Sequence, residues 1–393
     1  MVVIKGVSAK SILDSRKEKT ISVSIKTNVG SFSASAPNGK STGKYEARPY
    51  KKNVEGDIKV IKQFSDYFSE ESIDSFDDLK RIEDIVDRHV GANTIFALES
   101  AILKAISKEK KKEIWELINP SHNYPTKAKK PKFPRLVGNC VGGGKHSSGE
   151  KKPDFQEFLL IPSSNKVKES YEKNKGAKEK IKNFLEKTDE NFKGETNDEN
   201  AFKTLLNEKE VLEVLKDVKV PMGIDIAASS FYKRKNYHYK NPLLKRTKEE
   251  QLGYLTNLLK NFNLFYIEDP FEEDDFESFA GLLKKFPDRL IVGDDLTVTN
   301  SKRLEKAIKT KSINAVVVKP NQCGSLLEVK KVCKIAKKNN IQIVFSHRSG
   351  ETDEWILADL AFGFGADFFK CGIDGKEREA KLKRLIEIEK NFK

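Results

Sequence analysis

The chain has 393 residues, of which 37% are hydrophobic and 34% are charged, and its formal net charge is +14. At about 150 residues per domain this length suggests two or three domains, although a (β/α) barrel holds ~250 residues as one unit. The charge indicates either a lysine-rich solvated surface or affinity for nucleic acid. Acidic residues are mixed among the lysines and we find no aromatic-basic stacking motif, so we expect no specific nucleic-acid partner.

The first ten residues lack the apolar core of a secretion signal, and the apolar stretch at 357–369 is too short to span a bilayer. The four cysteines are scattered and form no CxxC pair, which argues against a structural zinc site and against a disulfide framework. We therefore expect a cytoplasmic protein without a membrane partner.

The N-terminal part combines strands with helices. Apolar residues alternate between positions 20 and 36 on both sides of Asn28-Val29-Gly30, which predicts a β-hairpin. From about 56 to 118 apolar residues recur at helical spacing, as in Ile95, Leu98, Ile102 and Ile106. A connection rich in Pro and Lys follows at 119–133. The pattern predicts an N-terminal α+β domain over residues 1–125.

The C-terminal part predicts a (β/α) barrel over residues 126–393. Residues 164–200 are rich in Lys, Glu and Asn and predict a charged helix followed by a long loop. Short apolar runs recur along this part, and each holds or leads to a polar or charged residue, namely Glu157, Asp225, Glu268, Asp294, Lys319, Ser346-His347 or Lys370. Helical stretches separate these runs, and alternating strands and helices predict a parallel sheet. In such a barrel the catalytic groups lie at the C-terminal ends of the strands.

Three carboxylates would converge at the mouth of this barrel, from Asp225, Glu268 and Asp294. Carboxylates that share one site repel each other and require a cation. An all-oxygen ligand set that also accepts water and substrate oxygens suits magnesium. Each carboxylate alone could instead cap the helix that follows it, but three of them at successive strand ends favour a metal site.

Lys319 and Lys370 also follow apolar strands. A lysine beside a bound cation in a dry site has a lowered pKa and can act as a general base. The alternative is a salt bridge that closes the barrel. Together with the carboxylates, these lysines suit proton abstraction next to a substrate carboxylate, because metal ions stabilise the resulting dianion.

Six segments resemble motifs of the enolase family. Residues 294–300 read DDLTVTN and residues 346–352 read SHRSGET, like two family signatures. Residues 38–43 resemble its mobile SGASTG loop, residues 267–271 its IEDPF strand, residues 319–322 its KxNQ strand and residues 91–93 its GAN helix start. The resemblance runs from about residue 11 to 387, in the order of the family.

The resemblance implies a magnesium-dependent lyase with two ions per site. This lyase interconverts 2-phosphoglycerate and phosphoenolpyruvate in glycolysis and gluconeogenesis, as a homodimer or a higher homo-oligomer. Asp225, Glu268 and Asp294 resemble the ligands of the first magnesium ion. Ser41 resembles the lid residue that binds the second ion and lies at the substrate.

The remaining site residues follow from the same resemblance. Lys319 resembles the base that removes the C2 proton, Glu199 the acid that helps the C3 hydroxyl leave, and Glu157 its partner. The other expected site residues are the substrate-carboxylate ligand Lys370, the phosphate ligands Arg348 and Ser349, the substrate neighbour Gln156, and the histidines His146 and His347. A forked arginine suits phosphate binding.

Two departures from the family motifs leave alternatives open. The GDEGG segment around the acid reads Asn197-Asp198-Glu199-Asn200-Ala201, and the lid carries Lys40 where the family has a small residue. The first departure predicts a changed loop path, and the two departures together allow an enolase-like paralogue that has altered or lost catalysis and acts as a binding protein. A sugar-acid dehydratase of the wider superfamily is a further alternative, which the SHRSGET segment disfavours.

Overall fold

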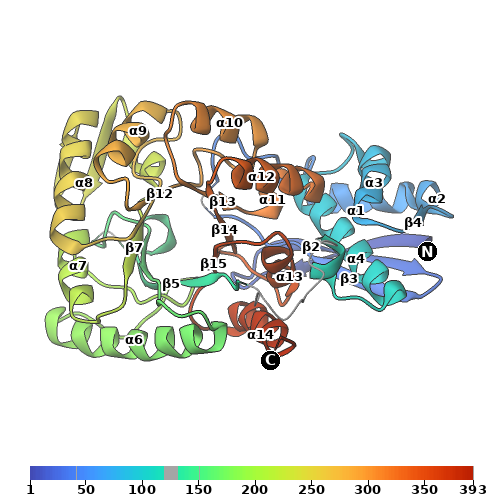
Figure 1. Ribbon diagram of the computed structural model, residues 1–393, viewed down its shortest axis with the longest axis horizontal. Coiled ribbons are helices and arrows are strands. Elements are labelled where there is room, and N and C mark those ends of the chain that lie inside the picture. The colour runs from blue at the N-terminus through green and yellow to red at the C-terminus, as the bar shows by residue number, and fades with distance from the viewer. Residues whose placement is uncertain (41, 119–131, 150, 393) are drawn as a thin grey trace.

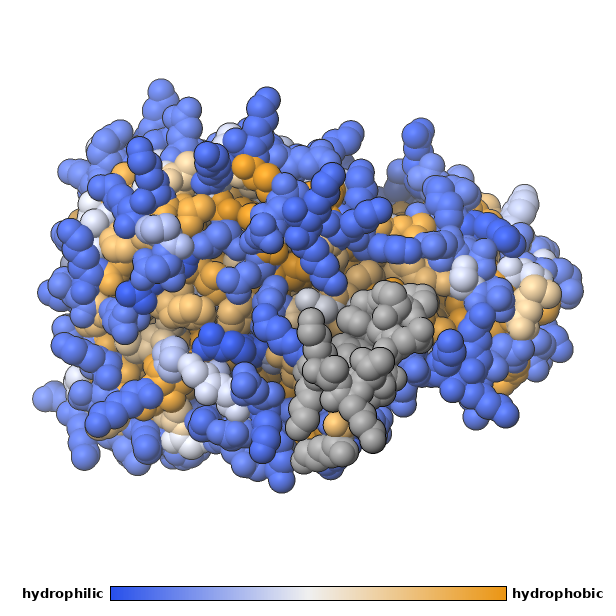
Figure 2. Space-filling view, viewed as in Figure 1, coloured by the Kyte–Doolittle hydropathy of each residue, from blue (hydrophilic) through white to orange (hydrophobic). Residues whose placement is uncertain are grey.

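The computed structural model describes residues 1–40, 42–118, 132–149 and 151–392. An N-terminal domain of strands and helices lies beside a larger barrel domain (Figure 1). The expected boundary at 125/126 lies outside the described residues. Hydrophilic side chains cover most of the visible face of both domains, in keeping with the expected charged surface (Figure 2). Among the described residues no helix is both long and apolar enough to cross a membrane.

The N-terminal domain contains an antiparallel sheet in the order β3-β2-β1-β4. Its strands are β1 (Val2–Leu13), β2 (Lys19–Thr27), β3 (Gly30–Ser35) and β4 (Ser72–Ile73). The helices are α1 (Val54–Gln63), α2 (Ser65–Phe68), α3 (Leu79–Val86), α4 (Ala92–Lys110) and α5 (Ile114–Ile118). Strands β2 and β3 form the predicted hairpin, and the largely buried helix α4 packs against both of them. The sequence analysis did not predict β1, where a register shift between Ile4 and Gly6 interrupts the alternation of apolar residues.

The barrel is closed by eight strands in the order β11-β12-β13-β14-β15-β5-β6-β7. They are β5 (Arg135–Gly142), β6 (Glu157–Leu160), β7 (Met222–Asp225), β11 (Tyr266–Glu268), β12 (Leu290–Gly293), β13 (Ala315–Val318), β14 (Gln342–Ser346) and β15 (Phe368–Lys370). The expectation of a wholly parallel sheet is wrong in one place, because β6 runs antiparallel to both β5 and β7. The connection from β5 to β6, residues 143–156, contains only a short 3-10 helix (Gly144–His146) among its described residues and no α-helix that crosses over the barrel, in keeping with the reversed direction.

Helices surround the barrel (Figure 1), and this part of the chain also forms a small three-stranded sheet. The helices are α6 (Val167–Thr188), α7 (Glu208–Lys216), α8 (Lys248–Phe262), α9 (Phe276–Lys285), α10 (Ser301–Lys309), α11 (Pro320–Cys323), α12 (Leu326–Lys338), α13 (Ile356–Gly363) and α14 (Lys376–Lys390). The small sheet consists of β8 (Tyr232–Lys233), β9 (Asn236–Lys240) and β10 (Leu243–Arg246). Capping boxes begin α7 at Asn207 and α8 at Thr247. The predicted charged helix at 164–200 is α6, and the predicted loop follows it.

The barrel interior is apolar below its mouth. Tyr266, Val317 and Phe368 belong to this interior cluster, whereas Val316 and Val318 of β13 pack into the outer core. Because side chains alternate along a strand, Glu268 and Lys370 point inward two positions after Tyr266 and Phe368. The strands therefore place these charged groups directly above the apolar layer, at the C-terminal rim of the barrel.

Candidate active site

One cavity lies at the mouth of the barrel and collects the predicted residues. Every predicted site residue except Glu268 and Ser41 lines it. Glu268 lies next to the cavity, where its carboxylate contacts Lys370. Ser41 lies outside the described residues. Glu157 stands at the start of the reversed strand β6, paired with Asp225 at the end of β7. The reversal therefore brings Glu157 to the same rim as the other charged groups.

Two lysines neutralise the predicted metal ligands. The Lys370 ammonium lies 2.9 Å from Oδ2 of Asp225 and 2.8 Å from Oε1 of Glu268. The Lys319 ammonium contacts Oδ2 of Asp294. Tyr266 donates a hydrogen bond of 2.6 Å to Oε2 of Glu268, and Gln156 donates one of 3.3 Å to Oδ2 of Asp225. All three carboxylates are thus held in place by donors.

The electrostatics of this cluster favour additional positive charge. Burial, together with the negative charge of Asp225, raises the pKa of Glu268 to about 8. Burial alone would lower the pKa of Lys319, but the adjacent Asp294 carboxylate outweighs burial and raises it. The sequence analysis expected a lowered pKa for Lys319, because it placed a bound cation beside this lysine. In the structure the Asp294 carboxylate lies beside Lys319, and the pKa is raised instead.

The donor set fits magnesium, because Asp225, Glu268 and Asp294 are buried and offer only oxygen atoms. As a set, however, these three carboxylates are not the most closely spaced possible metal ligands in the structure. In the described part of the chain, two sets of possible ligands lie within 4.8 Å of one another, namely His146, Glu157 and Glu199, and Asp269, Asp294 and Asp295. In the second set, Asp269 already accepts hydrogen bonds from the backbone amides of Asp294 and Asp295, at 3.0 and 2.7 Å.

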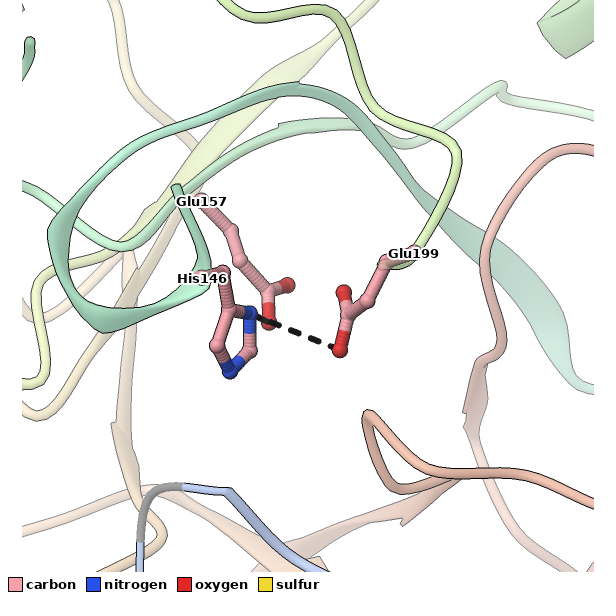
Figure 3. A group of neighbouring side chains, drawn as sticks. All are labelled: His146, Glu157 and Glu199. Atoms are coloured by element: carbon pink, nitrogen blue, oxygen red, sulfur yellow. Dashed lines mark ion pairs between the residues drawn. The ribbon is translucent and has the colours of Figure 1, made fainter. Parts of the chain in front are cut away.

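The opposite side of the cavity is formed by His146, Glu157 and Glu199, whose side chains point toward one another from three separate segments (Figure 3). Nδ1 of His146 lies 3.5 Å from Oε1 of Glu199 and 3.6 Å from Oε1 of Glu157. Nε2 of His347 lies 3.8 Å from Oε2 of Glu199. Glu157 also contacts the Lys370 ammonium at 3.2 Å, so it connects this group to the carboxylate cluster.

These buried groups can hold and exchange protons. Burial and the charge of Glu199 raise the pKa of the Glu157 carboxyl well above its usual range. One proton is therefore retained at neutral pH by the pair of carboxyls. Burial lowers the pKa of both His146 and His347, which favours neutral imidazoles next to the pair. The arrangement can deliver a proton into the cavity.

The segment around Glu199 forms a tight turn without the two glycines. Oδ1 of Asn197 accepts hydrogen bonds from the amides of Glu199 at 2.9 Å and Ala201 at 3.0 Å. Asn200 takes a left-handed conformation at φ 61°, which asparagine tolerates better than most residues. Its side chain donates to the Asp374 carbonyl at 3.2 Å. The Asn197 side chain and the left-handed conformation of Asn200 thus stabilise this turn without glycine, and Glu199 lines the cavity.

The third side of the cavity carries Arg348 and Ser349 after β14. The Arg348 guanidinium donates to Asn321 at 3.2 Å and forms an ion pair with Glu46 at 3.0 Å. Arg16 donates to the Ser349 hydroxyl at 2.8 Å. The lid backbone passes so close to Arg348 that a Cβ on Gly39 would lie 1.8 Å from Nη2.

The sequence analysis missed several residues of this site. Glu46 contacts Arg348, Asn139 donates to Oε2 of Glu199 at 3.0 Å, and Gln322 donates to Oδ1 of Asp294 at 3.1 Å. Glu46 and Gln322 lie within or beside segments that were singled out, so their polar side chains next to motif residues were a usable signal. Asn139 lies on β5, which was not predicted as a strand, and no pattern pointed to it.

Comparison with known proteins agrees with this geometry. The family model "Enolase, C-terminal TIM barrel domain" matches residues 131–393, and "Enolase, N-terminal domain" matches residues 4–118. The chain is 35% identical to the enolase of Methanosphaera stadtmanae, covering 99% of this chain and 97% of that protein. It is also 35% identical to the enolase of Methanocorpusculum labreanum over the full length of both, and 34% identical to that of Pyrobaculum aerophilum, covering 94% and 91%. The family uses magnesium, and the buried acidic clusters could hold a metal ion. With both domains matched and the relatives covered nearly end to end, the chain belongs to the enolase family.

Proposed function

We propose that this chain catalyses the reversible dehydration of 2-phosphoglycerate to phosphoenolpyruvate. The observation that carries this proposal is that a candidate base and a candidate acid face one cavity from opposite sides. Lys319 lies on the side of the strand-end carboxylates, together with Lys370, and the proton-holding group of His146, Glu157 and Glu199 lies opposite. An elimination across two adjacent carbons needs a base at one carbon and an acid at the other, and this cavity offers both.

The residues have distinct roles in this proposal. Lys319 removes the proton at C2, and the pair Glu157 and Glu199 delivers a proton to the C3 hydroxyl, which leaves as water while the C2–C3 double bond forms. Lys370 binds the substrate carboxylate, with Gln156 beside it. Arg348 and Ser349 bind the phosphate, since a guanidinium fork matches its oxygens. His146 and His347 hold the acid pair in place.

Asp225, Glu268 and Asp294 are the proposed ligands of one magnesium ion, and Ser41 is a proposed ligand of a second. Bound magnesium would neutralise the negative charge that gathers on the substrate carboxylate. In the structure the Lys370 ammonium forms ion pairs with the carboxylates of Asp225 and Glu268. In this proposal the same lysine therefore contacts both the metal ligands and the substrate carboxylate.

The proposal is tested by the magnesium-dependent rise in ultraviolet absorbance when 2-phosphoglycerate is converted. Replacing Lys319 by methionine should lower kcat by about 10²- to 10⁴-fold, the usual contribution of a general base. Lys309→Met, an exposed lysine of α10, is the matched control and should keep the wild-type rate. No turnover from folded, magnesium-saturated protein would refute the proposal and favour a binding protein.

We further propose that the enzyme acts in the cytoplasm, in glycolysis and gluconeogenesis, as a homodimer or a higher homo-oligomer. The enolases to which the chain is similar motivate this proposal. Light scattering on the purified chain measures its mass directly, and a mass equal to one chain would exclude the oligomer.

A further inference from the structure

An ion pair joins the N-terminal domain to the turn that carries Glu199. Nζ of Lys40 lies 2.9 Å from Oδ2 of Asp198, across 158 positions of sequence. The Asp198 side chain is 13% exposed, so this contact is partly shielded from water. Lys40 itself lines the catalytic cavity, next to Gly39.

Both partners of this pair are held by their own segments. On the Lys40 side, the backbone of Asn38 exchanges two hydrogen bonds with Gly350, at 2.7 and 2.9 Å. On the Asp198 side, the neighbouring Asn197 side chain ties the amides of Glu199 and Ala201 into one turn. A displacement of Asp198 would therefore also move Glu199, the next residue in the same turn.

The same turn is anchored on its other side by the barrel. Asn200 donates to the Asp374 carbonyl at 3.2 Å, and Asn139 donates to the Glu199 carboxylate at 3.0 Å. Lys40 supplies the anchor from the N-terminal domain. Position 40 holds a small residue in the lid motif that this segment resembles, so that motif does not itself supply a partner for Asp198.

We propose that Lys40 and Asp198 are positioning residues, whose ion pair holds the 197–201 turn against the cavity so that the Glu199 carboxylate faces His146. The catalytic part of this inference rests on the function proposed above. The competing role for Lys40 is direct contact with the substrate phosphate, and the two roles predict different behaviour for the Asp198 variant.

The first test needs no substrate. Hydrogen exchange is measured on the full chain for the peptide that contains the Glu199 and Ala201 amides, in Lys40→Met, Asp198→Asn and Lys40→Arg. We expect exchange about two- to fivefold faster in the first two variants, the range for a partly exposed ion pair, and wild-type exchange in Lys40→Arg. Lys44→Met is the matched control, because Lys44 pairs with Asp274 at 3.4 Å from the same segment but away from Glu199. Unchanged exchange in Asp198→Asn overturns the proposal.

The second test is a double-mutant cycle on turnover. Lys40→Met and Asp198→Asn should each lower kcat about two- to fivefold at nearly constant KM, and the double variant should fall no further than either single variant. Additive losses, or a higher KM in Lys40→Met with Asp198→Asn unchanged, overturn the proposal and assign Lys40 to the phosphate. If the protein has no turnover at all, the proposed function fails while the exchange experiment still decides the role of the ion pair.

Discussion

The buried carboxyl of Glu208 makes the stability of this protein depend on pH. Glu208 begins α7 and is 2% exposed. Its Oε1 accepts a 2.8 Å hydrogen bond from the Tyr254 hydroxyl, while Oε2 is buried without a hydrogen-bond partner among the described residues. Burial raises the pKa of Glu208 from 4.5 to about 7. We predict that Glu208→Gln removes this pH dependence.

The sign and the size follow from linkage. A carboxyl whose pKa is higher in the folded state favours folding while it is protonated. Its contribution is complete below the unfolded pKa and is lost as the pH rises through about 7. A shift from 4.5 to about 7 corresponds to about 3 kcal/mol. Relative to the wild type, Glu208→Gln should therefore gain up to about 3 kcal/mol between pH 5 and pH 8, because the glutamine still accepts from Tyr254 and does not ionise.

The assay is urea unfolding at several values of pH, followed by the fluorescence of Trp115 and Trp355. The difference in free energy of unfolding between variant and wild type isolates Glu208, since all other groups titrate in both proteins. Glu213→Gln, an exposed glutamate of the same helix, is the control and should show a constant difference. A constant difference for Glu208→Gln as well would refute the reasoning.

Three further predictions concern the site. Gly39→Ala should raise KM for 2-phosphoglycerate about 10- to 100-fold, because its Cβ would displace the Arg348 guanidinium, and an unchanged KM would contradict the phosphate role of Arg348. Asn200→Ala should lower the free energy of unfolding by about 1–2 kcal/mol in thermal melts, whereas Asn200→Gly should cost less; equal losses would show that the φ of 61° is not the cause. Magnesium at 100 times its Kd should stabilise the protein by about 2.7 kcal/mol, which is measured as a higher Tm that EDTA reverses. Glu268→Gln should lose this rise in Tm. A rise in Tm that survives in Glu268→Gln would place the ion elsewhere.

The barrel was predictable because its signal is local. The strands β11, β12 and β13 are short apolar runs that end in or directly precede a charged residue, so sequence alone predicted Glu268, Asp294 and Lys319 at one rim. The direction of β6 was not predictable in this way. Its apolar run reads the same in either direction, and the reversal that brings Glu157 beside Asp225 is set by pairing with β5 and β7, which are distant in sequence from the run itself.

The strand β5 was missed because its sequence contains residues typical of turns. Gly138 is required there by close packing, since a Cβ would lie 2.6 Å from Ile373, and this contact spans more than 200 positions. Two ion pairs, Glu46 with Arg348 and Lys40 with Asp198, likewise join residues that are far apart in the sequence. They join the two domains, and no local pattern in the sequence specifies which charged residues meet there.

The division of labour between Lys319 and Glu199 is the central claim, and one measurement separates the two roles. Magnetic resonance can follow loss of the C2 hydrogen of 2-phosphoglycerate in deuterated water with magnesium present. In Glu199→Gln, the account predicts that exchange at C2 continues while formation of phosphoenolpyruvate falls by about 10²-fold or more, and that Lys319→Met loses both. Loss of C2 exchange in Glu199→Gln together with its retention in Lys319→Met would contradict the account.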